Sequence, residues 1–480
     1  MLNTETGFGE KVLVGILMLF FLALPYTLKS MPVSICDSVK NLVPDDNFKC
    51  GVLKVPEDHD LENGKQISIA YLILQSHANI ASQDPFVHLS GGPGLAQLFA
   101  SNIEYWSSHP VREKRDIILF DQRGIGFSSS LPTFRDEYLE IIASDITSMQ
   151  EELRVKELLK DYKSQCDEKS IKLENYNTYY NAKDVGLLMD KLGYQKYNVY
   201  GVSYGTVLGR LVQDLFPDYV KTAIYNSPKL FGEDMLTDRL KSYSNALELI
   251  FEYSEKEYNS DSFDLRKKYF EVLDSINAKP LKINHQGKDF FINAHDAIYL
   301  LRRKLYAPDS RKTLPVLLEE LSNGGGPILN ELISGESNLA SVFNYSMWLA
   351  VERSDFFQKN ATVEADQVHE SFPLVPFRMG FFSAMYYGVK DWFVPKISED
   401  KKVFKLSSIP TLITVKRYDP ITPPKNGLIY KEKIPGAHLF ILDESGHAGN
   451  YGPCENEIII NFMDNPQQRL NTTCLNLWED

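Results

Sequence analysis

Short apolar runs alternate with longer amphipathic stretches along most of the chain. Runs that are apolar throughout, or that alternate with period two, predict β-strands, whereas a period near 3.6 residues predicts helices. The predicted strands cover residues 51–57, 67–75, 86–90, 116–121, 197–202, 221–226, 410–416 and 437–443. Strands that alternate with helices indicate a mainly parallel sheet with helices on both faces. The pattern therefore predicts a doubly wound α/β fold.

This alternation is interrupted between residues 230 and 404, where strand-like runs become rare and helical patterns dominate. We interpret the block 230–404 as a helical cap that is inserted into the sheet domain. The sheet domain is then predicted to consist of residues 36–229 and 405–480. The length of 480 residues agrees with one large domain that carries an insertion.

Residues 1–30 contain the apolar run 12–26, which Lys11 precedes. A helix needs about 20 apolar residues to cross a bilayer, and this run is shorter. The run matches the hydrophobic region of a secretory signal peptide, and an uncleaved membrane anchor is the alternative. Both interpretations predict an exported protein that is periplasmic, extracellular or membrane-anchored.

The five cysteines also fit an oxidising compartment. Cys36 and Cys50 flank one short segment, and Cys454 and Cys474 flank another. A disulfide in each pair would close a loop of roughly 15–20 residues, which is worth about 3 kcal/mol in the chain-entropy model. Cys166 is left over, and a thiol of this kind is most often a small buried side chain.

The formal net charge of −13 bears on the class of partner. Nucleic acid is disfavoured, because binding to phosphates requires a basic surface. An excess of acidic side chains on a large protein surface mainly maintains solubility. The net charge therefore argues against nucleic-acid binding and does not favour any other class of function.

A candidate nucleophile lies between a predicted strand and a predicted helix, where residues 201–205 read Gly-Val-Ser-Tyr-Gly. A serine on such a sharp turn needs small neighbours, and a glycine on each side supplies them. Residues 90–94 read Ser-Gly-Gly-Pro-Gly after another strand. Such a loop can present N–H groups to an oxyanion, together with the N–H of Tyr204. The alternative is an ordinary turn in which Ser203 caps the helix.

The partners of Ser203 are expected further along the chain, in the order Ser, Asp, His. His447 follows the strand 437–443 and lies among small residues that leave its imidazole free. Asp419 follows the strand 410–416 and is the predicted acid, with Asp443 as the alternative. An acid on a separate strand end reaches the imidazole from its far side, which favours Asp419.

These segments together resemble the proline iminopeptidase and tripeptidyl aminopeptidase-like family of α/β-hydrolases. The resemblance rests on Gly-Gly-Pro-Gly at 91–94, Asp-Gln-Arg-Gly-Ile-Gly-Phe-Ser at 121–128, Gly-Val-Ser-Tyr-Gly-Thr at 201–206 and the segments around Asp419 and His447. It covers most of the chain from Cys50 to Cys474 and is weakest in the cap. The terminal cysteine pairs resemble the secreted branch of the family.

The resemblance implies an α/β-hydrolase fold and a serine exopeptidase that acts near a free N-terminus through an acyl-enzyme. It implies that the N–H groups of Gly92 and Tyr204 form the oxyanion hole. It also implies that Asp121 and Arg123 brace the loop beside the site and do not react. No metal or cofactor is expected.

The family resemblance further implies that acids of the cap hold the α-ammonium of the substrate. Asp355 lies where the secreted branch tends to carry an acid, and Glu352 is one helical turn away. The alternative for both residues is a solvated helix face.

Two other functions stay open. An α/β-hydrolase that acts on esters or small amides would use the same residues, because a fold does not determine the substrate. A non-catalytic binding protein could keep the fold, but the complete triad and the oxyanion loop argue against it. The expected partner is therefore a peptide or a small amide or ester, with a membrane only if the N-terminal segment remains as an anchor.

Overall fold

The structure is a computed structural model that describes residues 35–234, 236–257, 264–356, 370–389, 392, 394–402, 404–448 and 452–478. The predicted signal peptide or anchor at residues 1–30 lies outside the described residues. Within these ranges, no helix combines the length and the apolar character that a membrane crossing requires.

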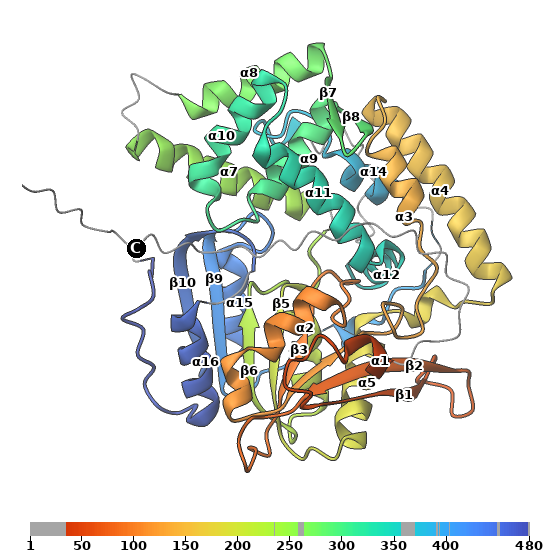
Figure 1. The fold of residues 1–480 in the computed structure, drawn as a ribbon, viewed down its shortest axis with the longest axis vertical. Coiled ribbons are helices and arrows are strands. Elements are labelled where there is room, and N and C mark those ends of the chain that lie inside the picture. Colours follow the sequence, from red (N-terminus) through yellow and green to blue (C-terminus); the bar gives the residue numbers. More distant parts are fainter. Residues whose placement is uncertain are drawn as a thin grey trace, which may run out of the picture. The chain divides into compact units, whose positions relative to one another are not determined.

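One sheet of eight strands forms the centre of the structure, in the order β1-β2-β4-β3-β5-β6-β9-β10 (Figure 1). Strand β2 is antiparallel to both of its neighbours, and the pairs from β4 to β10 are parallel. The strands are Phe48–Pro56 (β1), Gln66–Leu74 (β2), Phe86–Leu89 (β3), Ile117–Phe120 (β4), Tyr197–Val202 (β5), Val220–Asn226 (β6), Thr411–Tyr418 (β9) and His438–Ser445 (β10). This topology confirms the predicted α/β-hydrolase fold.

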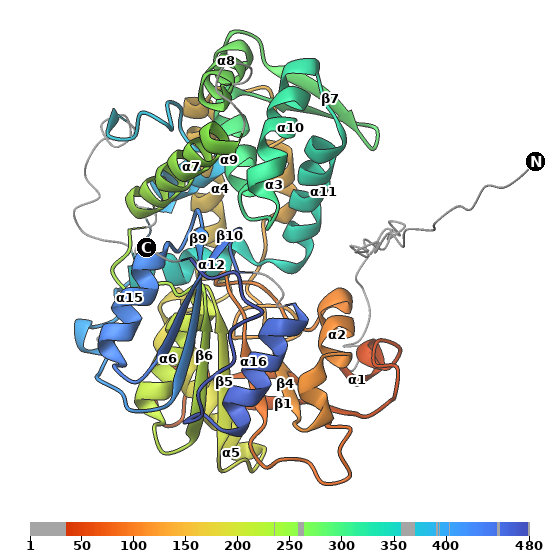
Figure 2. The same ribbon diagram turned by 90° about the vertical axis from the view of Figure 1, so that its left-hand side faces the viewer.

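Each face of the sheet has its own apolar core, because successive side chains of a strand point to opposite faces. On β5, Val199 packs with side chains of α5, α6 and α15, and its neighbour Tyr200 packs with α1, α2 and α16. Figure 2 shows α6 and α16 on opposite sides of the strands. The helices are Ile35–Val39 (α1), Ala100–Ser107 (α2), Thr178–Lys191 (α5), Tyr204–Leu215 (α6), Pro424–Lys433 (α15) and Pro453–Asp464 (α16).

The segment between β6 and β9 is mostly helical and lies over one end of the sheet (Figure 1). Its helices are Thr237–Glu257 (α7), Leu265–Ala278 (α8), Ala294–Lys304 (α9), Ser310–Asn323 (α10), Pro327–Val342 (α11), Tyr345–Val351 (α12), the π-helical turn Glu352–Phe356 (η3) and Gly380–Val389 (α14). Helices therefore dominate the region in which the sequence predicts a cap. The predicted residue boundaries of the cap remain a prediction.

Two further helices, Arg135–Ile141 (α3) and Ser148–Glu168 (α4), pack with this cap although the chain reaches them before β5. Helix α4 lies along α14, and the indole Nε1 of Trp392 donates a hydrogen bond to the carbonyl of Leu159 at 3.2 Å. Glu152 of α4 forms an ion pair with Arg378. The sequence predicts this stretch as part of the sheet domain, because the order of elements along the chain does not reveal which layer an apolar helix face joins.

The cap also contains an antiparallel hairpin that the sequence pattern did not predict. Its strands are Leu281–His285 (β7) and Lys288–Ile292 (β8). The two-residue turn places Gln286 at φ 51° and Gly287 at φ 83°, as tight hairpin turns require. Each strand has only five residues, so the apolar pattern is too short to stand out among the helical patterns of the cap.

Two disulfides tie the ends of the described chain to the sheet domain. Cys36 of α1 is bonded to Cys50 of β1, and Cys454 of α16 is bonded to Cys474. The thiol of Cys166 on α4 is free and buried, and burial raises its pKa. These are the pairs and the leftover thiol that the sequence analysis predicts.

We therefore expect a thiol reagent to label one cysteine in the unfolded, non-reduced protein. Labelling should fall on Cys166, because the other four sulfurs are bonded in pairs, and peptide mapping by mass spectrometry checks this. Labelling after reduction provides the control, since all five cysteines should then react. Free thiols at Cys454 and Cys474 before reduction would contradict the pairing.

Candidate active site

Ser203 lies at the turn between β5 and α6, with the unusual backbone angles φ 54° and ψ −119°. The turn is possible because both flanking glycines lie against other backbone atoms. A Cβ atom at Gly205 would lie 2.0 Å from the carbonyl oxygen of Leu89, and one at Gly201 would lie 2.4 Å from that of Gly205. Any larger residue would force these segments apart, so the glycines explain how the turn holds the serine hydroxyl at the end of the strand.

His447 follows β10 and reaches this hydroxyl. Its Nε2 lies 3.0 Å from Oγ of Ser203. The loop is fixed on both sides of the imidazole: the N–H of His447 donates to the carbonyl of Tyr306 at 3.2 Å, and the N–H of Ala448 donates to Oγ of Ser227 at 3.0 Å. The imidazole therefore lies within hydrogen-bonding distance of the serine without rearrangement.

Asp419 follows β9 and lies behind the imidazole. Its two carboxylate oxygens are 3.0 and 2.9 Å from Nδ1 of His447. The carboxylate is buried and also accepts hydrogen bonds from the N–H groups of Ile421 and Thr422, at 2.8 and 2.9 Å, and from Oγ1 of Thr422 at 3.0 Å. These donors hold the carboxylate in place, and the carboxylate in turn selects the imidazole tautomer that carries its proton on Nδ1.

The alternative acid, Asp443, is directed elsewhere. It pairs with Arg417 at 3.2 Å and with Arg311 at 3.8 Å. The structure thus brings Ser203, His447 and Asp419 together, and it places Asp443 with the two arginines.

The glycine-rich loop after β3 passes directly beside the nucleophile. A Cβ atom at Gly91 would lie 3.3 Å from Cβ of Ser203 and 3.9 Å from its Oγ. Gly92 has φ 108°, a conformation that favours glycine. Tyr204 is the first residue of α6, so its N–H group has no acceptor within the helix. Both predicted oxyanion donors therefore belong to segments that border Ser203.

The Asp-Gln-Arg motif supports this loop from below. The buried carboxylate of Asp121 accepts the N–H groups of Gln97 at 2.6 Å and Phe127 at 2.8 Å, and burial raises its pKa to about 6. Arg123 makes a two-pronged ion pair with Asp184 at 2.7 and 2.8 Å. Asp121 thus holds the segment that follows the loop. Arg123 bonds to Asp184 and to the carbonyl groups of Glu57 and Asn175, outside the loop, so its role as a brace stays a prediction.

The cap contacts the same glycine-rich loop. The N–H of Ala96 donates to the carbonyl of Val342 at 2.9 Å, and the N–H of Asn344 donates to that of Gly94 at 2.9 Å. A Cβ atom at Gly94 would lie 2.6 Å from the carbonyl oxygen of Asn344. The junction of α11 and α12 is therefore in close contact with the loop beside the nucleophile.

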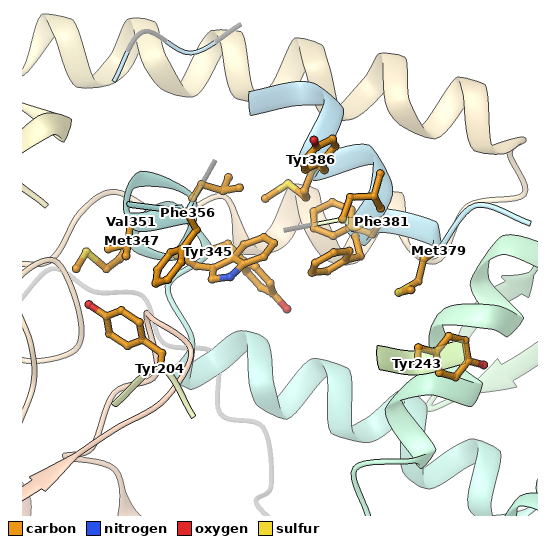
Figure 3. Packing of buried hydrophobic residues seen from close by; sticks show 14 of the residues in the cluster. Tyr204, Tyr243, Tyr345, Met347, Val351, Phe356, Met379, Phe381 and Tyr386 are labelled. Carbon is orange, nitrogen blue, oxygen red and sulfur yellow. The ribbon is translucent and has the colours of Figure 1, made fainter. Parts of the chain in front are cut away.

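Ser203 and His447 open into a cavity of about 280 Å³ between the sheet domain and the cap. Its wall is rich in aromatic side chains from α12 and α14, among them Tyr345, Trp348 and Phe381. Figure 3 shows Tyr345 and Phe381 among the packed side chains, and their ring centroids are 6.1 Å apart. A small cavity with mostly apolar walls and a few polar groups is typical of an enclosed ligand site.

Three carboxylates also line this cavity: Glu233 and Asp234 after β6, and Asp238 in the first turn of α7. None of them lies within ion-pairing distance of a basic side chain in the described part of the chain. Burial raises the pKa of Glu233 to about 7 and also raises the pKa of Asp238. A cationic ligand would stabilise the ionised form of these carboxylates, because it would supply the missing counter-charge.

The acids predicted to bind a substrate amine, Glu352 and Asp355, are not among the residues that line this cavity. Glu352 is fully buried and accepts Lys229 at 2.6 Å and Arg239 at 3.0 Å. Asp355 accepts the N–H of Thr178 at 2.8 Å and its hydroxyl, and burial raises its pKa to about 6. Both acids thus have partners inside the protein, while Oε2 of Glu352 and Oδ1 of Asp355 accept no hydrogen bond from the described residues. Their role in binding a substrate amine stays a prediction.

The structure adds residues that the sequence analysis did not single out. Thr422 contacts both Asp419 and His447, and it occurs in the proline-rich loop that the sequence had marked only for its acid. Glu233 lies in the segment that follows β6, so its place after a strand was a usable signal, whereas Asp238 already belongs to α7. Tyr306 comes from the distant cap, and no local pattern could have indicated its contact with His447.

One other group of side chains has the composition of a metal site. Glu151, His295 and Asp296 place one ligand atom each within 4.8 Å of one another. Burial lowers the pKa of His295 to about 4 and raises that of Asp296 to about 7. Asp296 also caps α9 by accepting the N–H of Asn293 at 3.0 Å. This group is not part of the cavity that contains Ser203.

Comparison with known proteins agrees with this geometry. The family model described as alpha/beta hydrolase fold matches residues 84–267, and the model described as TAP-like protein matches residues 379–474. A tripeptidyl aminopeptidase of Streptomyces coelicolor is 30% identical over 190 residues, which are 38% of this chain and only 35% of that protein. Serine protease Hip1 of Mycobacterium tuberculosis is 22% identical over 435 residues, covering 83% of this chain and 81% of that protein.

Among solved structures, proline iminopeptidase from Mycobacterium smegmatis is similar over 86% of this chain and 98% of that chain, with 13% identity and a TM-score of 0.42. The assignment of the fold rests on the sheet topology and on the two family models. The chain therefore has the α/β-hydrolase fold; residues 84–267 match the model of that fold, and residues 379–474 match the TAP-like proteins.

Proposed function

We propose that the protein is a serine exopeptidase that hydrolyses a peptide bond near a free N-terminus. One observation carries the proposal: the hydrogen-bonded series Ser203–His447–Asp419 opens into a cavity lined by carboxylates that have no basic partner among the described residues. The first arrangement suits acyl transfer, and the second suits a substrate with a cationic end. The named relatives include a tripeptidyl aminopeptidase and a serine protease.

The proposed reaction begins with attack of Oγ of Ser203 on the scissile carbonyl carbon. Nε2 of His447 accepts the hydroxyl proton, and the carboxylate of Asp419 stabilises the imidazolium that forms. The tetrahedral oxyanion accepts hydrogen bonds from the N–H groups of Gly92 and Tyr204. When the C–N bond breaks, His447 returns the proton to the leaving amine, which leaves an ester on Ser203. Water then hydrolyses this acyl-enzyme with the same proton transfers.

The cavity acids would recognise the α-ammonium of the peptide. An ammonium that enters a site with mostly apolar walls loses water, and this is costly unless a counter-charge replaces it. Glu233 is the best candidate, because its carboxylate is held only by neutral donors, the amide of Asn426 at 2.7 Å and the N–H of Leu230 at 3.3 Å. Asp238 lies on the same wall. Asp234 mainly holds the loop, since it accepts the N–H groups of Leu236 and Thr237.

We also propose that the protein works outside the cytoplasm. Its two disulfides are consistent with an oxidising compartment. The N-terminal apolar run supports export through either a signal peptide or an anchor.

Replacing either Ser203 or His447 by alanine should lower kcat by about 10³-fold or more without unfolding the protein. The double variant should be little worse than either single variant, because the two residues act as a unit. Steady-state kinetics with a peptide substrate, together with labelling of Ser203 by a fluorophosphonate probe, provide the measurement. Losses that multiply in the double variant would contradict the assignment.

Variants of the two candidate acids, Asp419 and Asp443, form a matched pair for the same kinetic measurement. Asp419→Asn should lower kcat by at least about 100-fold, because the amide no longer favours the correct imidazole tautomer. Asp443→Asn changes the same group on a neighbouring strand end and should leave kcat within about twofold. The reverse result would assign the role to Asp443.

Glu233→Gln should lower kcat/KM for peptides with a free N-terminus by at least about tenfold, since truncation of a buried charge pair typically costs about 2–5 kcal/mol. An uncharged ester of similar size should be hydrolysed at nearly the wild-type rate. N-acetylation of the peptide should reproduce the loss in the wild type and add little in the variant.

Asp355→Asn is the matched control for this experiment, because it removes a buried cap acid that does not line the cavity. It should leave the ratio between free and acetylated peptides unchanged. If the wild type cleaves acetylated peptides as well as free ones, the exopeptidase function is refuted and a general amide or ester hydrolase replaces it.

The pH dependence follows from the raised pKa of Glu233, about 7. Below this pH the carboxyl group is neutral and cannot pair with an ammonium, so kcat/KM for a free-amine peptide should fall as the pH decreases. Dividing this constant by kcat/KM for the uncharged ester removes the pH effects that both substrates share. The ratio should rise between about pH 5 and 8 in the wild type and stay flat in Glu233→Gln. An equal rise in the variant would exclude Glu233 as the titrating group.

A further inference from the structure

Arg302 of α9 is a charged side chain of the cavity wall that lacks a counter-ion. Its exposed fraction is only 1%, and it lines the same cavity as Ser203 and His447. Its guanidinium lies over the rings of Phe382 at 5.3 Å and Tyr306 at 5.4 Å. Its Nε and Nη2 have no hydrogen-bond acceptor, and no carboxylate of the described residues lies within ion-pairing distance of it.

Each of the other basic side chains of this wall pairs with an acid of the protein. Lys229 and Arg239 both pair with Glu352, at 2.6 and 3.0 Å. Arg303, the next residue along α9, pairs with Glu336 at 2.7 Å. Arg302 is thus the one basic residue of the cavity that has no acidic partner in the part of the chain that the structure describes.

The electrostatic situation of Arg302 favours an anionic ligand. Burial, together with the nearby charges of Arg239 and Arg303, lowers its pKa. Aromatic faces stabilise a guanidinium, but they leave its N–H groups without acceptors. Nε–H and one N–H of Nη2 point along the same edge of the guanidinium and form the fork that matches the two oxygens of a carboxylate. A bound carboxylate would therefore supply the missing charge, and it would satisfy the two donors once the buried edge of the guanidinium turns toward the cavity.

We infer that Arg302 binds a carboxylate of the substrate, so that the enzyme prefers peptides that carry a carboxylate close to the scissile bond. The inference rests on the proposed peptidase function. Two sources share this chemistry: the side chain of an aspartate or glutamate in the peptide, and the free C-terminus of a short peptide. The volume of about 280 Å³ is at the small end of ligand sites, which suits a short peptide or a peptide end.

Glu233 and Arg302 would then make the cavity complementary to a zwitterion. Glu233 and Asp238 offer negative charge from the segment after β6, and Arg302 offers positive charge from α9. None of the three is paired with another charged residue of the described chain. Both kinds of charge thus remain available to a ligand within one site.

The test compares peptides of equal length with a free N-terminus. One carries glutamine and an amidated C-terminus, the second has glutamate in place of glutamine, and the third keeps glutamine but has a free C-terminal carboxylate. The wild type should cleave the second, the third or both with a kcat/KM at least about tenfold above that of the first. Which of the two is preferred identifies the source of the carboxylate.

Arg302→Gln should abolish this preference, so that the ratio of kcat/KM between the charged and the neutral peptides falls by at least about tenfold. The variant should keep or raise Tm, since it removes a buried charge that has no partner. Arg266→Gln is the matched control, because Arg266 is an arginine of the cap that pairs with Glu248 and does not line the cavity. The Arg266→Gln variant should retain the preference for peptides that carry a carboxylate.

Two results would overturn the inference. The first is a wild type that cleaves charged and neutral peptides equally well. The second is an Arg302→Gln variant that loses activity to the same extent on all peptides with a lowered Tm, which would give Arg302 a structural role.

A second readout separates this inference from the peptidase function. Glutamate-containing and glutamine-containing dipeptides compete with fluorophosphonate labelling of Ser203. Stronger protection by the glutamate dipeptide, lost in Arg302→Gln, supports carboxylate binding even if no peptide is cleaved and the exopeptidase function fails. Equal protection by both dipeptides, with cleavage intact, refutes the role of Arg302 and leaves the peptidase function standing.

Discussion

The turn at Ser203 requires three backbone segments to pass within van der Waals contact of one another. Gly205 lies against the carbonyl of Leu89, and Gly201 lies against that of Gly205. This crowding brings the ends of β3 and β5 together and holds Ser203 at a positive φ. Because neighbouring parallel strands end at the same edge of the sheet, the loops after β3, β9 and β10 meet at this point. The oxyanion loop, Asp419 and His447 all depend on that meeting.

The cap depends on the same constraint. Its α11–α12 junction bonds to the backbone of the glycine-rich loop, at Ala96 and Gly94. The loop thus has one side against Ser203 and the other against the cap. A change in the conformation of this loop would displace both the nucleophile and the aromatic side chains of the cavity wall, since close-packed groups transmit displacements.

The arrangement of charged side chains determines which ligands the cavity favours. Glu352 pairs with both Lys229 and Arg239, and Glu336 pairs with Arg303, so each of these three basic side chains of the wall has an acidic partner inside the protein. The acids on the cavity surface are held by neutral donors, and Arg302 is held by aromatic rings. Buried charges that lack internal partners are costly unless a ligand supplies one. The groups that the fold leaves unpaired are therefore the ones most suited to recognise a substrate.

The sequence by itself determined the α/β fold and the residues that meet at the nucleophile, because these depend on local patterns. Strand periodicity, a serine between two glycines, and an acid and a histidine after successive strands all lie within a few residues of the feature they define. Only the tertiary structure decided between Asp419 and Asp443, because Arg311 and Arg417 engage the second acid. It also decided that Glu352 is paired inside the protein while Glu233 faces the cavity. The physical reason is that such pairings join separate segments of the chain, 26 positions apart for Arg417 and Asp443 and 123 positions apart for Lys229 and Glu352. They depend on side-chain direction and on competition for charge, which no local pattern encodes.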